Sequence, residues 1–155
     1  MVEPYARVHL RQADRFDVPS LAKLRVEALV EMGLLAPADG AAFTPRALAE
    51  LWRLYATDSA ASWLLCADGV AVGCASVVFW QRLPYPGTSL HAELAGVYVA
   101  PEYRRRGYAS ELISETLATA RARGVRRIVL QPTAQTRALY RTFGFDDSGQ
   151  LRLSP

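Results

Sequence analysis

Hydrophobic residues recur with two different periods along the first third of the chain, and each period predicts an element. Residues 7–11 alternate polar and apolar side chains, as expected for a short strand. Asp17 and Pro19 then begin a helix whose apolar residues are spaced by threes and fours: Leu21, Leu24, Ala28, Leu29 and Met32. Residues 33–43 form a loop, and Thr44, which precedes a proline, begins a second helix with the stripe Leu48, Leu51, Trp52 and Tyr55. Both stripes are typical of helix faces that pack on a core.

The middle of the chain predicts a strand hairpin over residues 62–80. Asp68 and Gly69 form the strongest short hairpin signal between two apolar runs. A two-residue turn at this point sets three facing pairs, which are Ala67 with Val70, Cys66 with Ala71, and Cys74 with Trp63. Both cysteines are then small apolar residues of a sheet and remain free thiols.

The second half of the chain alternates strand and helix patterns. The clearest helix runs from Tyr108 to Arg123 and ends before Gly124, with one apolar face: Ala109, Leu112, Ile113, Thr116, Leu117 and Ala120. The other predicted segments are a loop at 81–89, a strand at 90–100, a strand at 126–131, a helix at 136–142, and a final turn and strand at 144–155. We therefore predict one α/β domain over residues 1–155, with a central sheet that is antiparallel in its first half and is flanked by helices.

Composition narrows the class of protein. With 155 residues, of which 51% are hydrophobic, the chain is long enough to bury a core. No apolar stretch approaches the roughly 20 residues of a membrane-spanning helix, and the N-terminal residues are charged where a signal peptide needs an apolar segment. We expect a soluble, cytoplasmic protein with no membrane partner. Two cysteines are too few for a disulfide framework, and we expect no metal ion.

Three consecutive arginines, Arg104, Arg105 and Arg106, precede Gly107 and the predicted helix. A helix N-terminus presents unpaired backbone N–H groups and the positive end of the helix dipole, so it can bind phosphate. The phosphate loops of nucleotide triphosphatases and of dinucleotide-binding folds are both absent from the sequence. Nucleic-acid binding is also disfavoured, because no aromatic platform or helix-turn-helix pattern accompanies the arginines.

The pattern Arg104-x-x-Gly107-x-Ala109 resembles the pyrophosphate loop of the GNAT superfamily of acyl-CoA-dependent N-acetyltransferases. The resemblance extends over "VYVAPEYRRRGYASELI" at 97–113 and "ALYRTFGF" at 138–145, and covers Glu93 to Phe145 closely. It implies a mixed, mostly antiparallel sheet whose strands splay apart at a cleft for acyl-CoA. Acetyl-CoA is the implied cosubstrate, although a longer acyl group fits the same pattern.

The resemblance also implies which residues bind the cosubstrate. The pyrophosphate would lie on the backbone amides of Arg105, Arg106, Gly107, Tyr108, Ala109 and Ser110. The main chain of Val97 and Val99 would pair with the pantetheine arm, and an N–H near Val97 or Tyr98 would stabilise the oxygen on which charge develops. The side chains of the three arginines either meet the adenosine phosphates or lie in solvent. Thr133 occupies a position where the family often has an asparagine that contacts the arm; the threonine retains a hydroxyl but lacks the amide.

Two residues are the first candidates for acid-base chemistry. An amine with a pKa near 10 must lose a proton before it attacks a thioester, and Glu93 is our first choice for the base, on the same strand face as Ala95, Val97 and Val99. His91, two residues earlier, and a water molecule are the alternatives. The structural alternative for Glu93 is a strand-end carboxylate paired with one of the arginines, and that for His91 is a surface histidine. The resemblance assigns Tyr140 as the group that protonates the leaving thiolate, with space filling beneath the acyl chain as the alternative.

The acceptor is predicted only as a class. The segments 33–43 and 80–89 and the C-terminal turn supply apolar residues (Leu34, Leu35, Phe43, Trp80 and Tyr85) and carboxylates (Glu31, Asp39, Asp146 and Asp147). This composition suits a small-molecule amine or a peptide, including a protein N-terminus. The alternative is a regulatory or structural domain that binds acyl-CoA without catalysis. The tail 150–155 either completes its own sheet or contributes a strand to a homodimer.

Overall fold

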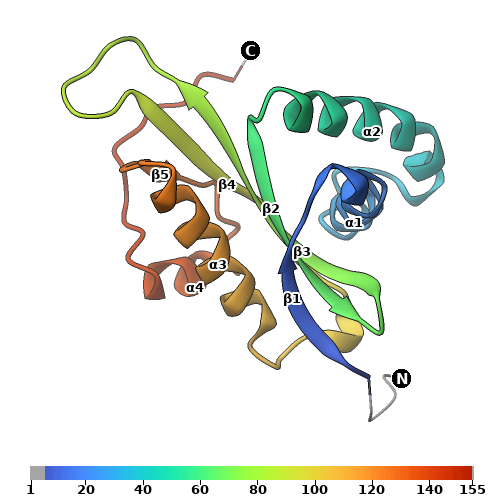
Figure 1. Ribbon diagram of the computed structural model, residues 1–155. Helices are drawn as coiled ribbons and strands as arrows, with labels where there is room; N and C mark the ends of the chain where they lie inside the picture. Colours follow the sequence, from blue (N-terminus) through green and yellow to red (C-terminus); the bar gives the residue numbers. More distant parts are fainter. Residues whose placement is uncertain (1–5, 155) are drawn as a thin grey trace.

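A five-stranded sheet in the order β1-β2-β3-β4-β5 separates two layers of helices in the computed structural model, which describes residues 6–154 (Figure 1). The elements are β1 (Val8–Gln12), η1 (Arg15–Asp17), α1 (Val18–Glu31), η2 (Pro37–Asp39), α2 (Gly40–Ala56), β2 (Ala60–Ala67), β3 (Val70–Gln81), β4 (Leu90–Val99), η3 (Pro101–Tyr103), α3 (Tyr108–Ala122), β5 (Ile128–Val129) and α4 (Arg137–Thr142). Helices α1 and α2 cover one face, and α3 and α4 cover the other (Figure 1).

Strand pairing confirms the predicted mixed sheet. Strands β1 to β4 are neighbours in chain order and pair antiparallel, while β5 pairs parallel to β4. A parallel neighbour needs a crossover connection, which α3 supplies. Five of the six residues predicted for the apolar face of α3 are buried: Leu112, Ile113, Thr116, Leu117 and Ala120. The helix thereby fixes the connection after β4 against the sheet.

The β2–β3 turn forms as predicted, but the pairing beyond it differs. Asp68 and Gly69 have φ values of 48° and 83°, as a tight hairpin turn requires. Cys66 pairs with Ala71 as expected, whereas the predicted pairing of Cys74 with Trp63 is wrong, because a bulge shifts the register by one residue beyond Cys66. Cys74 instead pairs with Leu64 and is buried beneath α1, and this burial raises the pKa of its thiol to about 12. The thiol is therefore unreactive at neutral pH.

The second helix begins one turn earlier than predicted. Residues 33–43 were expected as a loop before a start at Thr44, but α2 begins at Gly40. The Thr44 hydroxyl donates to the Gly40 carbonyl oxygen at 2.8 Å inside the helix and does not cap it. Pro45 lies in the second turn of α2, where it removes one backbone hydrogen bond. Ala41 and Ala42 in the first turn have high helix propensity, which favours this earlier start.

The C-terminal strands are shorter than the alternating pattern indicates. The strand predicted at 126–131 is limited to Ile128–Val129 in β5. The strand predicted within 144–155 does not form in the described part, up to residue 154. Leu151 and Leu153 are 101% and 93% exposed. Alternation alone does not make a strand, because these apolar side chains have no surface here against which to pack.

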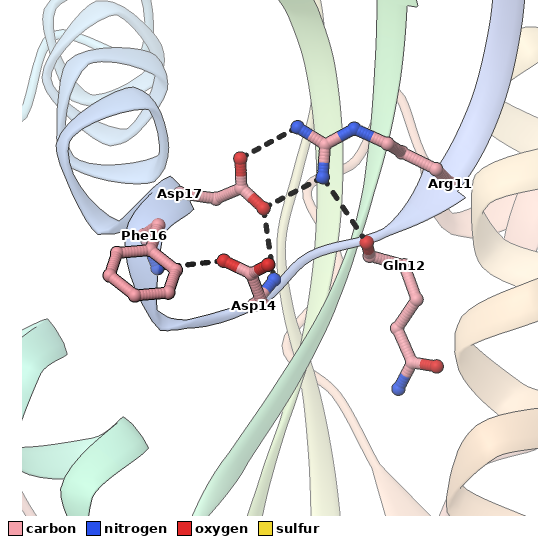
Figure 2. A network of polar contacts seen from close by, with 5 residues as sticks. All are labelled: Arg11, Gln12, Asp14, Phe16 and Asp17. Atoms are coloured by element: carbon pink, nitrogen blue, oxygen red, sulfur yellow. Dashed lines mark hydrogen bonds and ion pairs between the residues drawn. The ribbon is translucent and has the colours of Figure 1, made fainter.

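A polar network joins β1 to α1 (Figure 2). The Arg11 guanidinium donates two hydrogen bonds to the Asp17 carboxylate, at 2.6 and 2.7 Å, and lowers the pKa of that carboxyl group. Asp17 also accepts from the Asp14 amide at 2.9 Å, and Asp14 accepts from the Phe16 amide at 2.7 Å. These reciprocal bonds form a capping box before α1.

Asp17→Asn is expected to lower the free energy of unfolding by about 1–2 kcal/mol at pH 7. The substitution removes the charge from a carboxylate that accepts two hydrogen bonds from Arg11, and this ion pair is partly shielded from solvent. The folded-state pKa of Asp17 is depressed, so its contribution is present above the unfolded value near 3.9 and is lost as pH falls through the folded value. Urea unfolding at pH 7 and pH 3 measures this difference.

Asp58→Asn is the control, because Asp58 pairs with Arg123 at 3.0 Å but is 83% exposed. Little change in stability is expected for this variant. The stabilising role of the Asp17 carboxylate would be contradicted if the free energies of unfolding of wild type and Asp17→Asn differed as much at pH 3 as at pH 7.

Candidate active site

The connection from β4 to α3 contains two residues in the left-handed backbone region. Arg105 has a φ of 61°, and Gly107, the N-cap of α3, has a φ of 84°. This conformation is readily adopted only by glycine. A Cβ atom built on Gly107 would meet no atom within 4 Å, so the space over the helix start is open. Gly107 is thus required by the backbone conformation and leaves the N-terminus of α3 accessible.

Six consecutive backbone amides in this connection have no acceptor among the described residues. They run from Arg105 through Ser110, and the first amide of α3 to find a carbonyl is that of Glu111, which donates to Gly107 at 3.1 Å. No side chain caps the helix. Unpaired donors at the positive end of a helix dipole form a site for an anion. The donor set fits a diphosphate, whose several oxygens can share these amides.

The side chain of Arg104 is already engaged. Its Nε donates to the Val99 carbonyl oxygen at 2.7 Å, and its NH2 group donates to the Glu31 carboxylate at 2.6 Å. This contact holds the connection onto the end of β4 and the end of α1. It lowers the pKa of Glu31, which was predicted as a partner of the acceptor's ammonium group. Arg105 and Arg106 are exposed and form no ion pair within residues 6–154.

Strand β4 has a bulge and a long unpaired edge next to this connection. Ser76 pairs with Ala95 and Cys74 with Tyr98, so β4 contains one additional residue at Gly96, whose φ is 63°. On the other side, β4 pairs with β5 only at Ala92 and Glu93. Its backbone beyond Glu93 therefore pairs with no described strand on the β5 side, and apart from the Val99 carbonyl oxygen, which accepts from Arg104, this edge can bind an extended ligand as an added strand does.

The bulge changes which side chains share a face. Glu93 was predicted to share a strand face with Ala95, Val97 and Val99. The prediction holds for Ala95 and is wrong for Val97 and Val99. Val97 and Val99 pack with α3, whereas Tyr98 packs on the α1 side. Glu93 follows Ala95 and Tyr98 by its register with β3. The carboxylate of Glu93 therefore belongs to the sheet face that α1 and α2 cover.

His91 lies on the same face as Glu93, as predicted. It pairs with Trp80 and is 7% exposed. Burial lowers the pKa of its imidazole, and the nearby guanidinium groups of Arg82 and Arg127 lower it further. Glu93 is half-buried and forms no ion pair with a described residue, so it is not held in a structural salt bridge.

Tyr140 reaches the opposite face from α4. It packs against the cluster of Leu94 and Ile113, and its ring meets Phe145 edge-on with centroids 5.9 Å apart. It lines a cavity of about 520 Å³ bounded by β5, α4 and the segment 144–150. Burial raises the pKa of the Tyr140 hydroxyl, so the group stays protonated at neutral pH and can donate a proton.

Thr133 and the predicted acidic residues are partly engaged elsewhere. The hydroxyl of Thr133 is 3.0 Å from the hydroxyl of Thr136, in the turn before α4. Asp147 forms ion pairs with Arg137 and Arg141 at 3.0 and 3.6 Å. Asp39 and Asp146 form no ion pair within the described part of the chain.

Two features of the site were missed by sequence reasoning. Gly96 inside a strand pattern is a known signal for a bulge, and it could have warned of the change of face. The contact between Arg104 and Glu31 joins residues 73 positions apart. No local pattern carries a signal for such a pair.

Comparison with known proteins identifies the family. The model of the acetyltransferase (GNAT) family matches residues 31–145. The chain belongs to the GNAT acetyltransferase family. A curated relative, the uncharacterized N-acetyltransferase YjgM of Escherichia coli (strain K12), is 28% identical over 141 residues, which cover 88% of this chain and 81% of the relative. The resemblance predicted from the sequence is confirmed, and the chain is an acetyltransferase of this family.

Solved structures share the fold. A predicted acetyltransferase from Clostridium acetobutylicum with acetyl-CoA has a TM-score of 0.84 at 20% identity, covering 96% of each chain. The aminoglycoside N-acetyltransferase AAC(6')-Iy in complex with CoA has a TM-score of 0.72 at 22% identity, covering 100% of this chain and 98% of that one. The GNAT-like mixed sheet with flanking helices is thereby confirmed. None of the helices within residues 6–154 is long and apolar enough to cross a membrane.

Proposed function

We propose that this GNAT protein transfers an acetyl group from acetyl-CoA directly to the primary amine of a small molecule or peptide, with both substrates bound at once. The single observation that carries the proposal is the run of six amides from Arg105 through Ser110 without acceptors among the described residues, at the start of α3. A diphosphate bound there fixes one end of the cosubstrate, and the free edge of β4 leads from that point to Glu93.

The cosubstrate is then positioned by main-chain groups. Val97 and Val99, on the part of β4 that does not pair with β5, pair with the pantetheine arm. Arg105 and Arg106 meet the adenosine phosphates with exposed guanidinium groups. Arg104 acts indirectly, because its side chain holds Val99 and Glu31. Thr133 remains a predicted contact of the arm through its hydroxyl.

Glu93 and Tyr140 approach the reaction from opposite faces of the sheet. The acceptor enters from the α1 and α2 side, where Glu93 takes a proton from its ammonium group, directly or through water. An N–H of Val97 or Tyr98 near the bulge donates to the oxygen on which charge develops. Tyr140, held protonated by burial, then donates to the departing thiolate from the α3 side. A proton is thus taken on one side and returned on the other.

Glu93→Gln is expected to lower kcat at pH 7 by about 10- to 100-fold. This loss is small for the removal of a general base, because water and hydroxide can partly replace the carboxylate. The deficit should shrink as pH rises toward the pKa of the acceptor amine. His91→Asn serves as the comparison. If that variant shows the deficit and Glu93→Gln does not, His91 is the base.

The overall proposal is tested by measuring thiol release from acetyl-CoA across a panel of small amines and peptides. We expect turnover that requires an acceptor. Tight binding of acetyl-CoA without turnover for any acceptor would instead favour a regulatory or structural domain. Turnover confined to peptides would identify a protein N-terminus as the acceptor.

A further inference from the structure

Three basic residues meet at the end of the sheet that carries Glu93. Trp80 on β3 pairs with His91, and Ala92 pairs with Ile128, so Arg127 lies beside His91 directly before β5. The Ala92 amide donates to the Arg127 carbonyl oxygen at 3.3 Å. Arg82, one residue beyond β3, places its Nη1 atom 3.5 Å from His91 Nε2. The ends of three adjacent strands thus place Arg82 and Arg127 beside His91, with the Arg82 guanidinium closest to the imidazole ring.

The β3–β4 connection holds this group in place. The Arg82 amide donates to the Ser89 carbonyl oxygen at 2.9 Å, which closes the hairpin just past the strands. The guanidinium of Arg82 lies 5.4 Å from the centre of the Tyr85 ring. The rings of Trp80 and His91 are 5.9 Å apart. Aromatic contacts on both sides therefore restrict where Arg82 and His91 can point.

The positive charge of this group is not neutralised within the described residues. Neither Arg82 nor Arg127 forms an ion pair there, and both are exposed, while His91 between them is buried. Two like charges near a buried ring repel each other and disfavour its protonation, which agrees with the lowered pKa of His91. An anion that bridges the two guanidinium groups would relieve this repulsion and accept hydrogen bonds from both.

We propose that Arg82, His91 and Arg127 bind an anionic group of the acceptor, a carboxylate or a phosphate, while its amine lies at Glu93. The inference rests on the proposed function, because it assigns Glu93 the amine. His91 and Glu93 are two residues apart on one strand face, a separation of about 7 Å. This spacing suits an ω-amino acid, a short peptide or an amine phosphate better than an α-amino acid, whose amine and carboxylate share one carbon.

The two histidines of the chain allow a direct test by NMR. The imidazole signals of the intact protein are followed while 4-aminobutanoate or inorganic phosphate is added at constant ionic strength, set with sodium chloride. We expect the pKa of His91 to rise with added anion, because a bound negative charge stabilises the imidazolium. His9, which is exposed on β1, is the internal control and should not respond.

The double variant Arg82→Gln/Arg127→Gln should raise the concentration of anion that half-saturates the His91 response by at least about 10-fold, as expected for loss of charged hydrogen bonds. Both side chains are exposed, and the His9 signal reports whether the fold is kept. A response to phosphate alone identifies a phosphate-bearing acceptor, and a response to 4-aminobutanoate identifies a carboxylate. No response of His91, or an equal response of His9, overturns the proposal.

A separate titration with acetyl-CoA, followed on the backbone amide signals at the N-terminus of α3, distinguishes failure of the anion subsite from failure of the proposed function. If acetyl-CoA binds and His91 ignores both anions, the anion subsite is wrong and the transferase assignment stands. If His91 responds and acetyl-CoA does not bind, the subsite is an anion site unconnected with acetyl transfer, and both proposals fail.

Discussion

Gly107→Glu is expected to raise the Kd for acetyl-CoA by at least about 100-fold, equivalent to roughly 2.7 kcal/mol. The new side chain would extend from a backbone with a φ of 84° into the open space over the α3 amides. Its carboxylate would compete for the amides of Arg105 through Ser110 and would repel a diphosphate. Isothermal titration calorimetry with acetyl-CoA measures the change.

Gly87→Glu is the matched control for this variant. Gly87 also has a left-handed backbone, with a φ of 89°, and a Cβ there would likewise meet no atom within 4 Å. Both substitutions therefore add one negative charge and a similar strain of about 1–2 kcal/mol. Gly87 lies in the β3–β4 connection, at the opposite end of the sheet from the start of α3 (Figure 1). Equal loss of acetyl-CoA binding in the two variants would show that strain, and not the phosphate site, is responsible.

Tyr140→Phe is expected to lower kcat by roughly 10²-fold or more, as for loss of a general acid. The KM for acetyl-CoA should change little, because the ring and its contacts with Leu94 and Phe145 remain. Burial keeps the pKa of Tyr140 above its usual value, so the wild-type group is fully protonated through pH 8. Initial rates at saturating acetyl-CoA and a saturating acceptor measure the loss.

Tyr55→Phe provides the control for loss of a half-buried tyrosine hydroxyl. The pKa of Tyr55 is also raised by burial, an effect that the nearby Ser62 hydroxyl partly offsets. Ser62 bonds to Ser76 at 2.7 Å, and the Tyr55 hydroxyl has no hydrogen-bond partner among the described residues. Its removal should leave kcat unchanged and should not lower stability, since no hydrogen bond is broken. If Tyr140→Phe retains the wild-type kcat, Tyr140 only fills space beneath the acyl chain.

Local features of the sequence were sufficient to predict the geometry of the β4–α3 connection, where the cosubstrate is proposed to bind. The apolar face of α3, Gly107 at its start and Gly124 after its end are all encoded within one short segment, and each has a single structural consequence. The hairpin turn at Asp68 and Gly69 was predictable for the same reason. Such features depend on backbone conformation and helix periodicity, which act over a few residues.

Features that depend on register were not predictable in the same way. The bulge beyond Cys66 and the bulge at Gly96 each insert one residue, and each moves the following side chains to the other face. The bulge at Gly96 is the reason why the prediction that Glu93 and Val97 share a strand face was wrong. The contact between Arg104 and Glu31 and the absence of a strand in residues 144–154 depend on tertiary packing, which no local window contains.

The central claim is that the amides at the start of α3 bind a diphosphate, and NMR of those amides tests it most directly. The backbone signals of Arg105 through Ser110 are compared after addition of CoA or of pantetheine, which lacks the diphosphate. We predict large shifts of these six signals with CoA and none with pantetheine, whose effects should be confined to β4. Binding of CoA that leaves the six amide signals in place would contradict the account.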